Sequence, residues 1–341
     1  RGTKGGLKNE ICRIIKKLNL NLPSGKGFMY TNLVEEIKSD HVSGASEISR
    51  KACSAFVTFS SEVKAKSKEE YFDKLLKLGV DLVSAQPYMA SVFNLANSTL
   101  YYIEELLPTL SLEELYEFTK EKVEEFRCNS LNSMQKIAKH GEVLIEEGSK
   151  VMTFSSSGSI LSILKKAKGE GKKFEVIVGE SRPMFEGRLL AKFLGNAGIP
   201  VTLITDAAVG VFSKDATLFL VGADSISETT FVNKVGTKYL CLLSTEHEAP
   251  LYVACERSKF ISDGWRFKPM AWGDPKEVLD FELLNVKVEN PYYEEIPLSY
   301  CQKVITNEGF LSPQDIPNLI RKTRLCKRLM EGIKSSHTTT A

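Results

Sequence analysis

The chain has 341 residues, of which 43% are hydrophobic and 26% are charged, so it is long enough to bury two cores. Its 45 basic and 43 acidic residues give a formal net charge of +2, and this balance gives no indication of direct nucleic-acid binding. No apolar run reaches the ~18 residues that a transmembrane helix requires. We therefore expect a soluble, cytoplasmic protein with no membrane partner.

Cysteines and histidines give no sign of a metal site. Seven cysteines are scattered without a C-x-x-C pair, and the four histidines lie far apart in sequence, which predicts a reduced protein without a bound metal. The glycine fingerprint of dinucleotide-binding proteins, the lysine-containing phosphate loop of nucleotide triphosphatases and the G-x-S-x-G turn of hydrolases are absent. We therefore expect no cofactor.

The first 140 residues have a helical pattern, with apolar residues at three- and four-residue spacing. We expect helices over 9–22, 31–42, 49–63, 68–86 and 111–140. In the last of these, Ser111 is followed three residues later by Glu114, which is the spacing of a capping box. The pattern predicts a helical N-terminal domain over residues 1–140.

Residues 141–341 follow a different pattern, in which short runs rich in Val, Ile, Leu and Phe alternate with helix-like stretches. The expected strands cover 150–155, 174–181, 201–206, 217–224, 238–244, 251–256 and 303–306. The helix-like stretches cover 160–171, 185–198 and 229–247, and the last overlaps one strand run. Apolar strands alternating with helices indicate a Rossmann-like, doubly wound α/β domain with a mostly parallel sheet. Ligands bind such domains at the carboxyl ends of the strands.

A serine-rich turn follows the first expected strand, in the sequence TFSSSGS. Ser155, Ser156, Ser157 and Gly158 lie between this strand and a helix start, where free backbone N–H groups can hold a phosphate. The turn contains no basic residue, so the same sequence also fits a catalytic loop that has lost its chemistry. The local sequence leaves both interpretations open.

Polar residues follow other expected strands. Asp224, in LFLVGADSI, can bind a sugar hydroxyl or transfer a proton, and it fits equally well as the cap of a following helix. Asn233 and Lys234 supply an amide and an ammonium group suited to an anionic or hydroxylated ligand. Arg182 precedes Pro183, where it can bind a phosphate or pair with a neighbouring glutamate.

Several motifs, taken in order, resemble one superfamily. They are TFSSSGS, VIVGESRPMFEGRLLAKFL, VTLITDAAVG, LFLVGADSI, VNKVGT, YVACERSKF and VITNEGFLSP. The superfamily contains the alpha, beta and delta subunits of eukaryotic translation initiation factor 2B, methylthioribose-1-phosphate isomerase and ribose-1,5-bisphosphate isomerase. The resemblance spans nearly all of residues 141–313. It implies a helical N-terminal domain and a Rossmann-like C-terminal domain that forms a homodimer or higher oligomer.

The resemblance also implies roles for particular residues. Asp224 falls on a catalytic position of the isomerases, and Asn233 and Lys234 fall on their substrate-binding Asn-Lys pair. Gly44 lies in SGASEISRKA, which corresponds to a substrate-binding Arg-Gly-Ala loop. These matches imply a pocket for a phosphorylated small molecule.

Three positions depart from the isomerase pattern. Ser155 stands where the isomerases carry a catalytic cysteine, while Ser43 and Gln86 stand where they carry substrate-binding arginines. A serine hydroxyl stays protonated at neutral pH and needs an adjacent base, and loss of two guanidinium groups removes two positive charges. These departures point away from isomerase activity.

We therefore interpret the chain as a non-catalytic, initiation-factor-2B-like regulatory protein that keeps a sugar-phosphate or nucleotide pocket. Its expected partners are translation initiation factor 2 or related subunits. The alternative is an aldose–ketose isomerase of the ribose-1,5-bisphosphate or methylthioribose-1-phosphate type. A third possibility is a small-molecule-binding regulator unrelated to translation.

Overall fold

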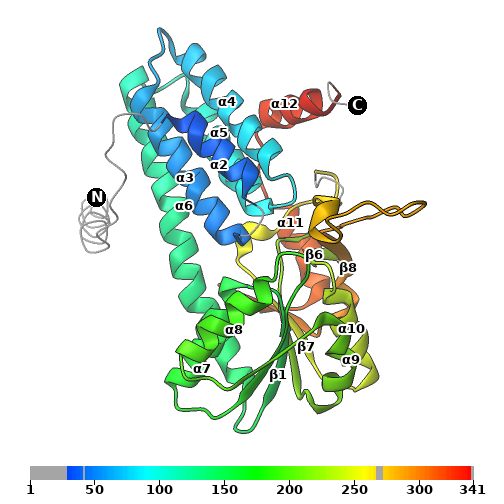
Figure 1. Cartoon of the computed structure of the whole chain (residues 1–341). Helices are drawn as coiled ribbons and strands as arrows, with labels where there is room; N and C mark the ends of the chain where they lie inside the picture. The colour runs from blue at the N-terminus through cyan, green and yellow to red at the C-terminus, as the bar shows by residue number, and fades with distance from the viewer. Residues whose placement is uncertain (1–28, 41–42, 266–271, 339–341) are drawn as a thin grey trace.

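The computed structural model describes residues 29–40, 43–265 and 272–338, and two regions of different architecture follow each other along the chain (Figure 1). The first region consists of helices α2 (Tyr30–Ser39), α3 (Ala45–Glu62), α4 (Lys68–Ala85), α5 (Ala90–Leu106) and α6 (Leu112–Gly141). The helix expected over 9–22 lies outside the described residues. The four later helices expected from the sequence are present, and α5 adds one that the pattern did not mark.

A single apolar core holds the helical region together. Phe56 and Phe59 of α3 and Tyr71 and Phe72 of α4 are among its largest fully buried side chains. The capping box predicted for α6 is confirmed, because Ser111 Oγ accepts from the Glu114 N–H while the Glu114 carboxylate accepts from the Ser111 N–H. Long amphipathic helices with marked starts therefore fold as their periodicity predicts.

The second region is built around a seven-stranded sheet. Its helices are α7 (Gly158–Gly169), α8 (Glu186–Asn196), α9 (Val209–Phe212), α10 (Thr237–Glu246) and α11 (Ile316–Ile320). The sheet contains β1 (Lys150–Phe154), β2 (Glu175–Gly179), β3 (Val201–Ile204), β4 (Leu218–Gly222), β7 (Leu251–Ala254), β9 (Lys303–Thr306) and β10 (Gly309–Leu311). The strand order is β10-β9-β7-β4-β1-β2-β3, and every neighbouring pair is parallel except β9 and β10. The predicted fold class, with its mostly parallel sheet, is confirmed.

Helices cover both faces of this sheet. In Figure 1, α7 and α8 lie on one side of the strands while α9 and α10 lie on the other. Neighbouring residues of the central strand β1 enter different cores, because Val151 packs with residues of α7 and α8 whereas Met152 packs with residues of α9 and α10. The sheet is therefore buried on both faces, which explains its continuous apolar runs.

One predicted strand was wrong. Residues 238–244 lie in α10, where the buried Leu240, Cys241 and Ser244 recur at one- and three-residue spacing as on a helix face. The helix begins after Gly236, whose φ of 101° turns the chain. Residues 230–234, which the sequence pattern placed in a helix, instead form β6 (Thr230–Lys234). This strand lies between β5 (Ser225–Ile226) and β8 (Tyr293–Pro297) in a second, antiparallel sheet.

The last helix, α12 (Lys327–Thr338), returns to the N-terminal region (Figure 1). Its Leu329 and Ile333, with Cys326 just before it, join the helical core, and α12 packs on α4. The C-terminal segment therefore crosses back over the division expected at residue 141. That division itself stays a prediction.

In the part of the chain that the structure describes, no helix combines the length and hydropathy of a membrane span. The six cysteines of this part are free, and no group of three His, Cys, Asp or Glu side chains there is placed to bind a metal ion.

Candidate functional site

A cavity of about 360 Å³ lies where the start of α3 meets the carboxyl ends of β1, β4 and β6. Eight of the candidate catalytic and ligand-binding residues line it: Gly44, Ser155, Ser156, Ser157, Gly158, Asp224, Asn233 and Lys234. These residues come from two walls. The helical wall is the start of α3, and the α/β wall is formed by the strand ends and the start of α7.

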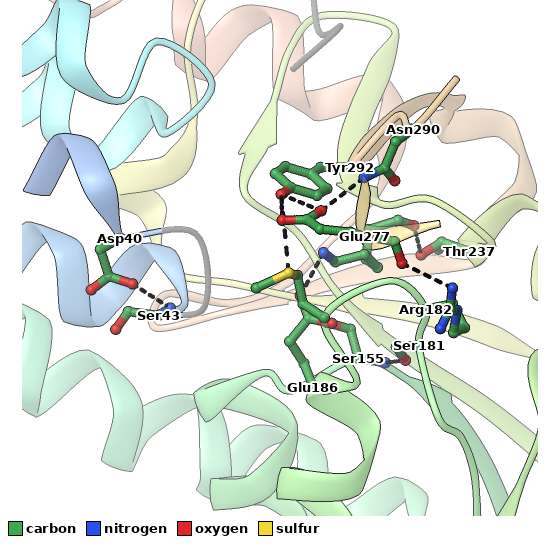
Figure 2. Close-up of polar contacts among 12 residues, drawn as sticks. Asp40, Ser43, Ser155, Ser181, Arg182, Glu186, Thr237, Glu277, Asn290 and Tyr292 are labelled. Atoms are coloured by element: carbon green, nitrogen blue, oxygen red, sulfur yellow. Dashed lines mark hydrogen bonds and ion pairs between the residues drawn. The ribbon is translucent and has the colours of Figure 1, made fainter. Parts of the chain in front are cut away.

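The serine loop of the α/β wall is held in an unusual conformation. Ser155 has a φ of 63°, in the left-handed region that residues other than glycine adopt at some energetic cost. Its N–H donates to Ser181 Oγ at 2.8 Å (Figure 2). The Ser181 N–H donates in turn to Asp206 Oδ1 at 2.7 Å. The Asp206 carboxylate therefore fixes the loop rather than facing a ligand.

The start of α7 presents backbone donors to the cavity. Ser157 is the N-cap of α7, and its Oγ accepts a hydrogen bond from the Ile160 N–H. The distance between Ser157 Oγ and the Ile160 nitrogen is 3.5 Å. The next two N–H groups, of Gly158 and Ser159, have no acceptor among the described residues. Gly222 brings β4 close to this turn, because a Cβ there would lie 2.7 Å from Ser157 Oγ. Such an arrangement can bind an anion without a side-chain charge.

Asp224 is an acid in the cavity lining. Burial raises the pKa of its carboxyl group, while the nearby ammonium groups of Lys259 and Lys234 act in the opposite direction. Its N–H donates to the Val232 carbonyl at 2.9 Å, and a short strand, β5, follows it. The alternative role as a helix cap is therefore excluded. A carboxyl group in this setting can donate a proton to a ligand.

Lys234 is not a free cation. Its Nζ lies 2.5 Å from Glu186 Oε1, and both side chains are at least 95% buried. Glu186 Oε2 is buried without a hydrogen-bond partner among the described residues, although Glu186 lines the cavity. The amide of Asn233 is partly used as well, since its Nδ2 donates to Thr237 Oγ1 at 2.9 Å. Asn233 and Lys234 therefore line the cavity with the positive charge of Lys234 already neutralised by Glu186.

Arg182 lies outside the lining of this cavity, apart from the other predicted ligand-binding residues, and its predicted role stays a prediction. Its Nη2 donates to the Glu277 carbonyl at 3.0 Å (Figure 2). Its backbone N–H donates to Asp206 Oδ2 at 2.7 Å, and the guanidinium lies over the Phe185 ring, 5.0 Å from its centre. The exposed side chain is therefore directed to the Glu277 segment rather than to the serine turn.

On the helical wall, the two positions without arginine differ from each other. Ser43 lines the cavity, and its N–H donates to Asp40 Oδ1 at 2.9 Å (Figure 2). Gln86 is buried outside the lining, where its Nε2 donates to the carbonyls of Ile37 at 2.7 Å and Asp40 at 3.0 Å. Gln86 thus ties down the end of α2 and offers nothing to a ligand.

Several lining residues with functional side chains were not among the candidate site residues: Arg50, Glu186, Lys259 and Tyr293. Lys259 is buried, and its Nζ donates to the Ala223 carbonyl at 2.7 Å. It follows β7 at a strand end, which is the signal that would have found it. Arg50 carries no such signal. It lies on the second turn of α3, and in the sequence it cannot be told from an ordinary charged residue on the exposed face of a helix.

Known proteins resemble this chain in sequence and in fold. A family model described as the Initiation factor 2 subunit family matches residues 41–313. A putative translation initiation factor eIF-2B subunit 2-like protein of Pyrococcus furiosus is 34% identical over 284 residues, or 82% of this chain and 95% of the relative. A ribose 1,5-bisphosphate isomerase of Archaeoglobus fulgidus is 35% identical over 287 residues, or 82% and 88%. The crystal structure of a Pyrococcus horikoshii translation initiation factor eIF-2B matches with a TM-score of 0.72 and 30% identity, over 84% of this chain and 98% of that one.

Proposed function

The chain belongs to the Initiation factor 2 subunit family, and we propose that it is an aldose–ketose isomerase acting on a pentose phosphorylated at C1. A relative named as a ribose 1,5-bisphosphate isomerase favours this function over the purely regulatory role that the missing cysteine suggests. The observation that carries the proposal is Asp224, a carboxyl group of raised pKa in a cavity at the carboxyl ends of the strands.

Asp224 can serve both proton transfers of such a reaction, one to the ring oxygen and one from the C2 hydroxyl. Conversion of a furanose 1-phosphate to the ketose breaks the bond between C1 and the ring oxygen and forms a carbonyl at C2. The C2 hydrogen passes to C1 as a hydride, with its electron pair, the ring oxygen gains a proton, and the C2 hydroxyl loses one. The protonated Asp224 gives its proton to the ring oxygen and recovers one from the C2 hydroxyl, so no oxidant or reductant is needed.

The direct test is to incubate the full chain with ribose 1-phosphate and with ribose 1,5-bisphosphate and to follow ketose formation by ¹³C NMR. We expect a C2 carbonyl signal, and we expect Asp224→Asn to lower the rate by about 10²- to 10⁴-fold, as for loss of a general acid. An unchanged rate in that variant would exclude Asp224 as the proton donor.

A non-catalytic regulatory protein is the second candidate, and Ser155 supports it. Serines and a glycine surround the Ser155 position, and its hydroxyl has no hydrogen-bonded base among the described residues to activate it as a nucleophile. For this candidate the cavity holds a phosphorylated effector, and the chain binds translation initiation factor 2 or a related subunit. Binding of ribose 1-phosphate without any turnover would favour this candidate.

Ser155→Cys separates the two candidates. If the chain is a regulator that lost its catalytic group, the new thiol should create turnover where the unmodified chain has none. If the chain is an isomerase that works through Asp224, the substitution should change the rate little. Ser156→Cys, one residue away in the same loop, is the matched control.

We also propose that the α/β region mediates self-association, as the family resemblance implies. Residues 278–286 expose several large apolar side chains: Val278, Phe281, Leu283, Leu284 and Val286. Leu284 is 91% exposed, which is unfavourable for a surface that faces only water. One chain has a mass of 38.0 kDa, and light scattering should give at least twice this mass. Leu284→Asp should lower the measured mass. A monomeric mass for the unmodified chain would contradict this proposal.

A further inference from the structure

Helix α6 runs along both regions of the molecule, packing on α5 in the helical region and on β9 and β10 in the α/β region (Figure 1). Two hollows lie beside it, with volumes of about 640 and 590 Å³. Because Phe126 and Asn129 line both hollows, the two form one continuous surface, which we call the α6 groove. Among the described residues, none that lines this groove also lines the cavity that contains Asp224.

The α6 groove has the length of a short extended peptide. The residues of α6 that line it run from Lys122 to Lys139. At about 1.5 Å per residue, this part of the helix is about 26 Å long. An extended chain rises about 3.3 Å per residue, so about eight residues span the groove. The other lining residues come from α5, the turn at 256–258 after β7, the β9–β10 turn at 307–308 and the segment 322–324 before α12.

The α6 groove carries an excess of positive charge. Its charged lining residues are Lys122, Lys136, Lys139, Arg257, Lys322 and Arg324, with Glu125, Glu256 and Glu308. Six basic against three acidic side chains give a net charge of +3, which exceeds the +2 of the whole chain. Positive charge is therefore concentrated in this groove, where it favours association with an anionic partner.

Exposed cations lie at both ends of the groove. Lys136 and Lys139 lie at one end, near the end of α6, while Lys322 and Arg324 lie at the other end, before α12. All four residues are exposed, and none has an ion-pair partner among the described residues. A carboxylate can therefore pair with these side chains at either end without displacing an existing ion pair.

Two other charged residues of the groove are held by contacts inside the protein. Arg257 Nη2 donates to the Leu319 carbonyl at 2.8 Å. Glu256 is buried, and its Oε1 accepts from Ser46 Oγ at 2.8 Å. These contacts fix the floor of the groove, so the exposed cations at its two ends are the groups that a partner can reach.

Between its two ends the groove carries amides and an aromatic ring. Asn129, Asn132 and Gln135 line it, and their side-chain amides make no hydrogen bond to other described residues. Such amides match the N–H and C=O groups that an extended peptide leaves unpaired. Phe126 is half-buried where the two hollows meet, so it can contact an apolar side chain of a bound peptide.

The groove fits a peptide better than a single-stranded nucleic acid, which binds by stacking its bases on open aromatic faces. The Lys122 ammonium group covers one face of the Tyr102 ring, 4.3 Å from its centre. Tyr101 packs against the same ring with the two ring centres 5.4 Å apart. Glu125 and Glu308 would also repel evenly spaced phosphates, whereas a peptide can confine its carboxylates to its two ends.

We propose that the α6 groove is a docking site for an extended acidic segment of a partner protein. The segment is about eight residues long, with carboxylate groups at both ends and an apolar residue near its centre. Its carboxylates pair with the exposed cations at the two ends of the groove, and its main chain pairs with the amides between them. Residues 1–28 of the chain itself do not meet this description, because they contain several basic residues and a single acidic one, Glu10.

Fluorescence anisotropy of the full chain with labelled octapeptides tests the ligand class. One set carries Glu-Glu at both ends and every combination of Gly, Ser and Leu at the four central positions, and a matched set carries Lys-Lys at both ends. We expect members of the acidic set to bind, more weakly as salt rises from about 50 to about 300 mM, and the basic set not to bind. Absence of binding by the acidic set, or equal binding by both sets, would overturn the inference. Tighter binding of octauridylate than of any acidic peptide would also overturn it, and would assign the groove to nucleic acid.

The first charge variant tests one end of the groove. Lys136→Gln combined with Lys139→Gln should raise the Kd of the tightest-binding acidic peptide by about 3- to 10-fold, because two exposed charge pairs are lost. Lys165→Gln combined with Lys173→Gln is the matched control, since it removes two charges from exposed residues outside the groove. The control should leave the Kd unchanged, and equal effects of the two double variants would contradict the assignment of the groove.

The second charge variant tests whether one peptide spans both ends. Lys322→Gln combined with Arg324→Gln should raise the Kd of the same peptide by a similar factor. Combining all four substitutions of the groove should multiply the two factors, because the two ends are far apart. A peptide whose Kd responds to only one of the two ends does not span the groove, and this result would overturn the inference.

A bulky side chain at the junction of the two hollows tests the path of the peptide. Asn129→Trp, at an exposed position, should raise the Kd by at least about 10-fold, because the indole ring would clash with the bound peptide. Leu131→Trp, on an exposed part of α6 outside the groove, is the matched control and should leave the Kd unchanged. If the acidic set fails to bind and Asn129→Trp lowers the mass measured by light scattering, a second copy of the chain fills the groove, and the inference is overturned.

Discussion

The two walls of the cavity differ in how their residues are used. The α/β wall keeps Asp224, Asn233 and Lys234 in the family pattern, yet its Lys234 is neutralised by Glu186. The helical wall holds Arg50, which no sequence motif marked and whose guanidinium has no partner among the described residues. A residue that matches a motif can therefore be unavailable to a ligand, while one outside the motif is available.

The largest effect should come from breaking the charge pair of the α/β wall. Lys234→Met leaves the Glu186 carboxylate buried without its counter-ion, which should lower the free energy of unfolding by about 3–5 kcal/mol. Urea titration followed by circular dichroism measures the change. The double variant with Glu186→Gln should recover most of this loss. If the double variant is no more stable than Lys234→Met, the buried Glu186 carboxylate does not depend on the Lys234 ammonium group for its stabilisation.

Gly222→Ala should have the next largest effect, because Gly222 joins the strand end to the serine turn. The new Cβ would lie 2.7 Å from Ser157 Oγ and 2.8 Å from Ser157 Cβ, so the turn must shift. We expect a loss of about 1–3 kcal/mol in unfolding free energy and weaker binding of ribose 1-phosphate.

The control for this substitution is Gly195→Ala in α8, where nothing lies within 4 Å of the added Cβ. A helical glycine with open space should gain about 0.5–1 kcal/mol when replaced by alanine. Equal stability changes at the two positions would show that the contact between Gly222 and Ser157 does not fix the turn.

Ser111→Ala tests the helical region at the start of α6, a position that does not line the cavity. It removes the capping-box hydrogen bond that Ser111 Oγ accepts from Glu114, and it should lower the unfolding free energy by about 1 kcal/mol. Thermal unfolding measures this loss, and titration should give an unchanged Kd for ribose 1-phosphate. A changed Kd would mean that the stability of α6 alone alters the cavity.

The smallest expected effect on stability is that of Asp224→Asn at acid pH, where the carboxyl group of the unmodified chain is protonated and neutral like the asparagine amide. Because burial raises the native pKa of this carboxyl group, the stability that its protonated form contributes is present at low pH and is lost as the pH rises through that pKa. Asparagine does not ionise, so the Tm of the variant minus that of the unmodified chain should increase with pH. A difference that stays constant between about pH 4 and pH 8 would show that Asp224 is not perturbed by burial.

The sequence allowed most of the fold and one wall of the site to be predicted. Strand ends are marked by local patterns, and a parallel sheet brings those ends together, so Asp224 and the serine turn could be grouped from the sequence alone. Pairing between distant side chains leaves no such mark. The contact between Glu186 and Lys234 joins residues from α8 and β6, and Arg50 faces the cavity only because α3 packs above the sheet.

The most direct test of the proposed function is a crystal structure of the full chain with ribose 1-phosphate bound. We predict that the ring oxygen or the C2 hydroxyl of the sugar lies within hydrogen-bonding distance of the Asp224 carboxyl group. A sugar bound in the cavity with neither of these oxygens near Asp224 would contradict the proposed function.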